Sequence, residues 1–416
     1  MSSMFSRLLL LASIVCILAP ADALALDTKI RLKLFGTAAF LPVHDIQRHL
    51  YGTPALDLNG DMRMVFRHSW GAVNLQVDHS TTFLSGDSFA LASAPQTSLD
   101  QTPVDDEARI MDLTFDIEDG SRHRSLHRFD RLALHYRKGD WAVTLGRQAV
   151  SWGNGMAFSP MDLFNPFAPT VVDQDYKAGD DLLLVERLFS NGNDLQLLAV
   201  GRRSISGDIS GDSSSAALKW HGFIGDGEME LLAAKHYADN VLAVSGRLPL
   251  GGAMLRSDIV ATQLDEGDIE ISGIVNLDYS FVVGDDLVYV FAEYYRNGFG
   301  VSKLPTSIAM LPRPLQSRLV RGEVFNMMRD YGALGIAVPW HPLVNQSLTF
   351  LLNLHDSSSL VQTSVSYEPG DHQRLQLGFV KPLGRAGDEF GGVSLLGTDL
   401  TSGGGARVFF RWLYYF

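Results

Sequence analysis

The chain has 416 residues, of which 46% are hydrophobic and 19% are charged, and its formal net charge is -13. This acidic balance argues against nucleic acid as a partner, because binding a phosphate backbone calls for basic patches. No Pro-rich or Ser-rich linker divides the chain. After residue 25, no stretch reaches the roughly 18 apolar residues of a transmembrane helix.

The first 25 residues have the composition of a secretory signal peptide. Arg7 precedes an apolar run over residues 8–19, and Ala23-Leu24-Ala25 is a small-residue cleavage pattern. We therefore expect residues 1–25 to be removed and residues 26–416 to form one domain. Cys16, the only cysteine of the chain, lies in the signal. The remaining chain is thus expected to have neither disulfides nor thiol chemistry.

Apolar and polar residues alternate from residue 29 to the end of the chain. In residues 29–40, Ile30, Leu32 and Leu34 share one face, whereas Arg31 and Lys33 share the other. A period of two indicates a strand with two different faces. Turns rich in Gly, Asp, Asn and Pro separate many of these segments. The predicted strands are residues 29–40, 61–69, 72–83, 129–137, 141–148, 182–188, 195–201, 216–221, 228–237, 241–248, 253–262, 269–281, 287–295, 331–338, 347–354, 360–367, 374–381 and 406–416.

The last strand carries an aromatic row at alternate positions: Phe410, Trp412, Tyr414 and Phe416. A soluble sheet would seldom expose such a row, because it invites aggregation. A bilayer explains it, since one face of the strand meets lipid and the other a polar lumen. The row resembles the assembly signal of Gram-negative outer-membrane β-barrels. That resemblance implies two partners, outer-membrane lipid and the barrel-assembly machinery.

The sequence therefore predicts an all-β fold, a transmembrane antiparallel up-and-down β-barrel, since lipid satisfies no backbone polar groups. We expect about 18 strands, with 16–18 plausible. One further alternating segment, residues 108–117, would make the number odd and reverse the alternation of short turns and long loops. We place it inside a long outer loop, residues 84–127. Other long outer loops are expected at residues 41–60, 150–179, 297–330 and 382–404, opposite short periplasmic turns.

A distinctive motif follows the strand that ends in Gly146-Arg147-Gln148. It comprises Ser151-Trp152-Gly153-Asn154-Gly155, a Pro-x-Asp at residues 160–162 and Asn165-Pro166-Phe167, and an acidic run over residues 173–181 comes next. This pattern resembles a family of largely uncharacterised proteobacterial outer-membrane barrels, which are similar to porins and alginate-export-type channels. The resemblance is most specific over residues 130–181. It implies fold and location rather than a substrate.

Two interpretations of this loop stay open. It folds into the pore as a constriction, or it caps the rim as a surface loop. In the first case the residues near the narrowest point are Arg147, Trp152, Asp162, Asn165, Asp173, Asp175, Asp180 and Asp181. The excess of carboxylates then favours cations over anions, although Arg147 opposes that preference.

Metal binding and catalysis find little support in the sequence. Counted from Asp173, the fifth and sixth positions are Lys177 and Ala178, which a calcium loop does not tolerate. Nucleophile-elbow, phosphate-loop and dinucleotide motifs do not occur. We expect no metal, no cofactor and no enzyme. The leading expectation is a porin-like channel or export conduit for a small polar or lipidic solute. The alternatives are a plugged barrel that serves a periplasmic export partner and, less favoured, a membrane-embedded hydrolase.

Overall fold

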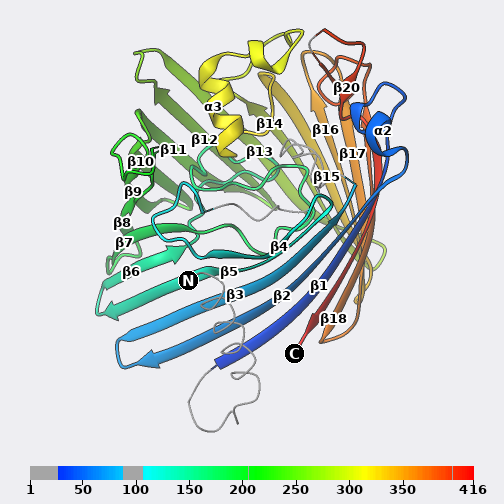
Figure 1. Ribbon diagram of the computed structural model, residues 1–416. Helices are drawn as coiled ribbons and strands as arrows, with labels where there is room; N and C mark the ends of the chain where they lie inside the picture. The colour runs from blue at the N-terminus through cyan, green and yellow to red at the C-terminus, as the bar shows by residue number, and fades with distance from the viewer. Residues whose placement is uncertain (1–26, 88–105, 205, 396) are drawn as a thin grey trace.

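A computed structural model describes residues 27–87, 106–204, 206–395 and 397–416. The expected signal peptide, residues 1–25, lies outside the described residues. Eighteen antiparallel strands pair with their neighbours in chain order, and the ring closes where β1 pairs with β21 (Figure 1). The predicted barrel of about 18 strands is confirmed.

The barrel strands have the following bounds: β1 Asp27–Phe40, β2 Ala55–Trp70, β3 Val73–Gly86, β5 His123–Lys138, β6 Trp141–Gln148, β7 Asp180–Leu188, β8 Asp194–Val200, β9 Ser215–Ile224, β10 Gly227–His236, β11 Asp239–Leu250, β12 Ala253–Gln263, β13 Ile269–Val283, β14 Asp286–Arg296, β15 Asp330–His341, β16 Val344–Asn353, β17 Ser359–Gly370, β18 Gln373–Leu383 and β21 Ala406–Tyr415. The other elements are α2 Ile46–Tyr51, β4 Thr114–Asp119, η4 Ile308–Met310, α3 Arg313–Arg321, β19 Val393–Ser394 and β20 Thr401–Ser402.

For two strands the predicted start lies too far along the chain. β2 starts at Ala55 rather than residue 61, and β5 starts at His123 rather than residue 129. The longer strands satisfy their backbone groups by pairing: Asp57 of β2 lies opposite Gly86 of β3, and Ser85 of β3 lies opposite His123 of β5. The expected loops 41–60 and 84–127 are therefore shorter than predicted.

The additional alternating segment is a short strand outside the ring. β4 pairs with the first half of β5, and β6 pairs with the second half. Its bounds, Thr114–Asp119, overlap the predicted segment 108–117 only in part. Because β4 occupies the edge of β5 that projects beyond β6, it adds a strand to the sheet without adding one to the barrel.

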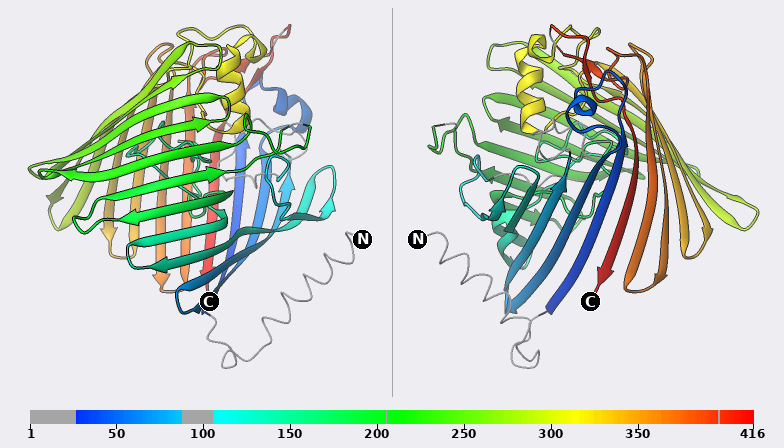
Figure 2. Two further views of the ribbon diagram at one scale, coloured as in Figure 1. Left: turned by 90° about the vertical axis from the view of Figure 1, so that its left-hand side faces the viewer. Right: turned by 45° about the vertical axis from the view of Figure 1, so that its right-hand side comes forward.

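The two rims of the barrel differ, as Figures 1 and 2 show. The C-terminus and the short turns, such as Lys138 to Trp141 between β5 and β6, lie at the lower rim. Both α2 and α3 lie at the upper rim with the longer connections. Among the described residues, no helix is long and apolar enough to cross a membrane.

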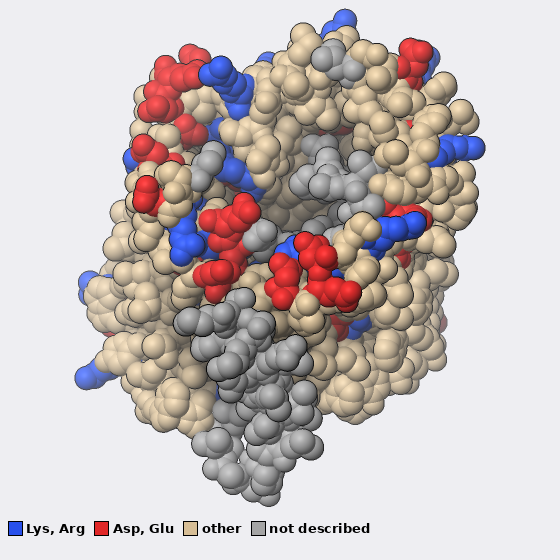
Figure 3. Space-filling view, viewed as in Figure 1, with Lys and Arg blue, Asp and Glu red and all other residues tan. Residues whose placement is uncertain are grey.

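The outer face of the wall is apolar, and the inner face is mixed. On β13, Val275 and Leu277 are exposed outward, whereas Asn276 is buried inside. Figure 3 shows wide uncharged areas on the wall, with Lys, Arg, Asp and Glu gathered towards the hollow in the view. This is the distribution expected where lipid surrounds the wall and charge faces the lumen.

The interior also holds two packed apolar clusters, which the alternating pattern did not predict. One includes Phe35, Phe158, Tyr331 and Phe409, and the other includes Trp152 with Leu198. In both clusters, residues of the 149–179 loop pack against inward-facing residues of the strands. Apolar burial of this kind stabilises the loop inside the barrel by roughly 25 cal/mol per Å² of area removed from water.

Candidate functional site

The loop between β6 and β7, residues 149–179, lies across the barrel interior. Its first part contacts β11 to β14, where Asn154 donates to Asp258 over 2.9 Å. Its last part contacts β1 and β21, where Asp173 lies 3.0 Å from Arg411. These strands are on different sides of the ring, so the loop spans the lumen. Of the two interpretations, the geometry matches an inward fold and not a cap on the rim.

The tip of the loop is held by one carboxylate of the wall. Glu293 of β14 accepts backbone N–H groups of Met156, Ala157 and Phe158 over 2.7, 3.0 and 2.8 Å. Asn276 of β13 donates to both the loop and Glu293. Three amides aimed at one carboxylate form a fixed charge-assisted contact, which positions this part of the loop.

A buried ion pair joins the end of the loop to its middle. Lys177 donates to both oxygens of Asp162 over 2.6 and 2.5 Å and also to Ser151. Burial raises the pKa of the Asp162 carboxyl to about 6, although the Lys177 ammonium acts in the opposite direction. Burial likewise lowers the pKa of Lys177. The pair therefore fixes the shape of the loop at an electrostatic cost.

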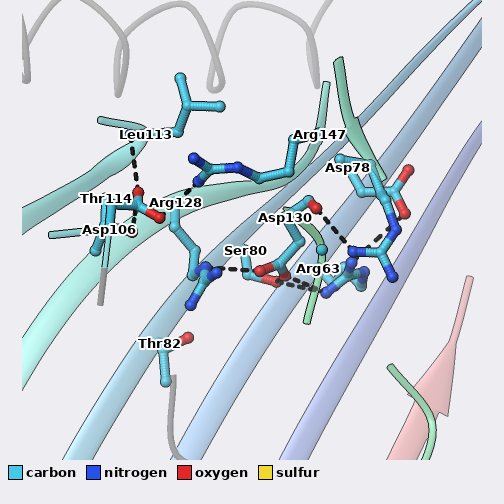
Figure 4. A network of polar contacts seen from close by, with 12 residues as sticks. Arg63, Asp78, Ser80, Thr82, Asp106, Leu113, Thr114, Arg128, Asp130 and Arg147 are labelled. Atoms are coloured by element: carbon cyan, nitrogen blue, oxygen red, sulfur yellow. Dashed lines mark hydrogen bonds and ion pairs between the residues drawn. The ribbon is translucent and has the colours of Figure 1, made fainter. Parts of the chain in front are cut away.

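Arg147 lies under the loop and does not line an open path. Its side chain is fully buried and forms ion pairs with Asp181 over 2.8 Å and with Asp106 over 2.7 Å. Figure 4 shows Arg147 beside a neighbouring network in which Arg63 and Arg128 both approach Asp130. Arg147 thus ties the end of β6 to the segment that precedes β4.

The acidic run contacts cations of the wall at every predicted position. Asp180 pairs with Arg202 over 2.8 Å, and Asp173 pairs with Lys33 over 2.5 Å. Burial alone would raise the pKa of Asp173, but Lys33 and Arg411 lower it to about 2. Asp175 contacts Arg31 over 2.9 Å and also Arg411.

These ion pairs remove the basis for the expected cation preference. That expectation treated the four aspartates as free carboxylates at a constriction, but each is compensated by Arg or Lys of the wall. A compensated charge contributes little field to a passing ion. The sequence does show the acidic run, but it does not show which cations the barrel brings to it.

The two remaining predicted residues serve the loop's conformation. Trp152 is buried, and its ring meets the ring of Phe164 edge to face at 5.3 Å. Asn165 has a φ of 52°, a left-handed conformation that Asn tolerates better than most residues, and it directly precedes Pro166. The structure therefore brings the eight predicted residues into one loop and its base, with Trp152 and Asn165 in packing positions.

Several contact residues were not predicted as part of the site. They are Arg31, Lys33 and Arg63 on the first two strands, Asp258 and Glu293 on β12 and β14, and Tyr176 and Lys177 in the loop. Arg31 and Lys33 already occupied the polar phase of the first strand. That phase predicted a lumen position, but the partner in the loop depends on how the ring closes.

One set of contacts at the upper rim resembles a Ser-His-Glu triad. The Ser215 hydroxyl lies 2.9 Å from Nδ1 of His236, whose Nε2 lies 3.1 Å from Glu323. Ser215 is buried, and its oxygen also accepts from Arg202 over 2.8 Å. These contacts join the segment that follows α3 to β9 and β10 of the wall. Among the described residues, no group of three or more His, Cys, Asp or Glu is placed to hold a metal ion.

Comparison with known proteins finds similarity in structure only. No family model and no curated protein sequence matches the chain. A BenF-like porin from Pseudomonas fluorescens has a TM-score of 0.51 at 10% identity, covering 94% of this chain and 98% of that one. OccK2 (OpdF) from Pseudomonas aeruginosa, solved with glucuronate, gives 0.52 at 10% identity over 94% and 97%. OccAB4 from Acinetobacter baumannii gives 0.52 at 11% identity over 96% and 100%. At this identity the likeness concerns the fold.

Proposed function

We propose that this chain is a porin-like channel of the Gram-negative outer membrane for a small polar solute. The observation that carries the proposal is the 149–179 loop, which spans a charged lumen between β14 on one side and β1 and β21 on the other. A loop anchored in this way narrows the path of a solute through the barrel, and its anchors are on the wall and not on the loops of the upper rim. Its eight predicted residues act through the loop's shape and its ion pairs.

The structural neighbours support this proposal. Those with the same architecture include a BenF-like porin and a protein solved with glucuronate, which is a small polar solute. The motif over residues 146–167 adds the resemblance to porin-like and alginate-export-type barrels. We accordingly propose outer-membrane lipid and the barrel-assembly machinery as partners, and we propose no enzymatic role.

Ion conductance of the purified protein in planar lipid bilayers tests the proposal. We expect discrete conductance steps from the inserted wild-type protein. A variant in which residues 157–171 are replaced by a short Gly-Ser linker should conduct more, because most of the loop's crossing segment is removed while Asp173 and Lys177 stay. Gly-Ser segments are flexible and pack little.

A barrel plugged for a structural or export role is the second candidate, and the two apolar clusters inside the barrel favour it. In that case folded, inserted wild-type protein would show no steps, whereas the loop-shortened variant would conduct. A hydrolase is tested separately with a lipid-ester substrate. Turnover that is lost in Ser215→Ala would contradict our assignment of Ser215, His236 and Glu323 to structure.

A further inference from the structure

A row of buried cations lines the inner wall where the first and last strands meet. Arg31 of β1 lies opposite Arg63 of β2, and Arg411 of β21 lies opposite Phe35 of β1, two residues from Lys33. The wall supplies Asp61 to Arg31 and both Asp78 and Asp130 to Arg63. For Arg411, the carboxylates within reach among the described residues both come from the 149–179 loop.

The loop places a short acidic segment, Asp173 to Tyr176, on this row. Asp173 contacts Lys33 and Arg411, and Asp175 contacts Arg31 and Arg411. The ring of Tyr176 covers the guanidinium of Arg63 at 3.7 Å and that of Arg31 at 4.5 Å. The segment thus presents two carboxylates to the cations, as a small dicarboxylate would.

The segment does not satisfy all the donors of the row. The Nε–H groups of Arg31, Arg63 and Arg411 are buried, and none has a hydrogen-bond partner among the described residues. A buried donor without an acceptor is costly. Carboxylates that are not tethered to a loop can align side-on with a guanidinium and take two N–H groups at once. The row therefore has unused binding capacity for an acidic ligand.

We propose that this row is a binding site for a solute with two carboxylates, and that residues 173–176 are its built-in competitor. The inference rests on the proposed channel function and adds a solute class and a gate to it. In the empty channel the segment occupies the row, and an entering dicarboxylate displaces it. Displacement starts at Asp175, which is exposed, whereas Asp173 is buried.

Removal of the competitor should strengthen binding of the solute. When the binding-competent state is populated only in part, the apparent dissociation constant is the intrinsic one divided by that populated fraction. We measure block of the potassium current by succinate in planar bilayers, with uncharged succinamide as the matched probe. In Asp173→Asn/Asp175→Asn we expect succinate to bind about ten-fold tighter or more. In Asp175→Asn the gain should be smaller, and succinamide should block no variant.

Two further variants serve as controls. Asp116→Asn/Asp119→Asn removes the same number of charges from β4, where both residues are exposed, and it should bind succinate like the wild type. Arg411→Gln removes the cation that both loop carboxylates share, and succinate block should weaken at least ten-fold.

The outcomes separate the two proposals. Conductance with unchanged or weaker succinate block in both Asp173→Asn/Asp175→Asn and Asp175→Asn overturns the competitor and leaves the channel intact. A folded wild-type protein that conducts nothing overturns the channel itself. Should the double variant fail to insert, Asp175→Asn decides, since Asp173 keeps its contacts to Lys33 and Arg411 there.

Discussion

Asp173 links the titration of a single carboxylate to the position of the loop. Lys33 and Arg411 hold the folded-state pKa of Asp173 at about 2, below its ordinary value of 3.8. A lowered carboxyl pKa stabilises the folded loop at pH values above the ordinary one, and this stabilisation is lost as the pH falls through the folded value. The contribution is on the order of 2 kcal/mol at neutral pH.

We therefore predict that acidification from pH 8 to about 5 leaves this contact in place. The reporter is a dye on Gln174→Cys, a position exposed to the lumen, in the Asp162→Asn/Lys177→Met background, which lacks the buried pair whose carboxyl pKa is about 6. Its fluorescence should stay constant over that range and change below about pH 4. The same dye on β4, at Asp119→Cys, controls for effects of pH on the dye itself. A transition centred near pH 6 at Gln174 would contradict the assignment.

The buried pair of Lys177 with Asp162 gives a second prediction for single residues. Lys177→Met leaves the Asp162 carboxylate buried without its cation, and breaking a buried pair in this way costs roughly 3–5 kcal/mol. We expect residues 150–179 to become sensitive to protease in an otherwise intact barrel. Asp162→Asn/Lys177→Met removes both charges and should restore most of the protection. Equal protease sensitivity of the two variants would show that the loop depends on other contacts.

Individual strands test the assignment of faces. Leu255 of β12 and Leu277 of β13 lie opposite each other and point to lipid, whereas Arg256 and Asn276 lie opposite each other on the inner side. Leu277→Arg should reduce the free energy of unfolding by roughly 2–4 kcal/mol, as charge on the lipid face of a barrel does near mid-bilayer. Denaturant titration of the barrel in lipid vesicles measures this change.

The matched control is Met254→Arg, which adds the same charge on the inner side opposite Asp278. It should cost much less than Leu277→Arg. Asn276 is a poor control even though it faces inward, because it donates hydrogen bonds to the loop and to Glu293. Similar losses at residues 254 and 277 would contradict the assignment of the two faces on β12 and β13.

The whole barrel could be predicted because its signal repeats in every strand. Alternation with a period of two and the composition of turns are local features of the sequence, and because they recur in eighteen strands an error in one strand does not change the predicted fold.

The site could be predicted only where its residues are close together in the sequence. Asp173 and Asp175 are two residues apart in the sequence, but Arg31 and Arg411 reach them from opposite ends of the chain. That proximity exists only after ring closure, so no local pattern encodes it. The extension of β2 and β5 was missed for a similar reason, because pairing beyond the rim and not strand propensity sets their ends.

Ring closure provides a prediction for the whole molecule. Phe416 is the last residue, and its backbone N–H donates to Ile30 of β1 over 3.0 Å beside the β21–β1 pairing. Deletion of Phe416, or Tyr414→Ser with Phe416→Ser, should yield misassembled, protease-sensitive protein in cells. Heat-dependent gel migration reports folded barrel. Phe223→Ser, which removes an exposed aromatic near the lower end of β9, is the control and should assemble. Normal migration of the Phe416 deletion would count against the terminal aromatic row as an assembly signal.

The contacts of the acidic segment also depend on closure of the ring. Asp173 reaches Lys33 on the first strand and Arg411 on the last, and Asp175 likewise touches both strands through Arg31 and Arg411. The segment therefore bridges β1 and β21, the two strands whose pairing closes the ring, from inside the barrel. The contacts with Lys33 and Arg31 need only β1 and the loop, whereas those with Arg411 also need the final strand. The loop's full set of contacts therefore exists only in the closed ring, and any variant that leaves the β21–β1 pairing open also loses the contacts of Asp173 and Asp175 with Arg411.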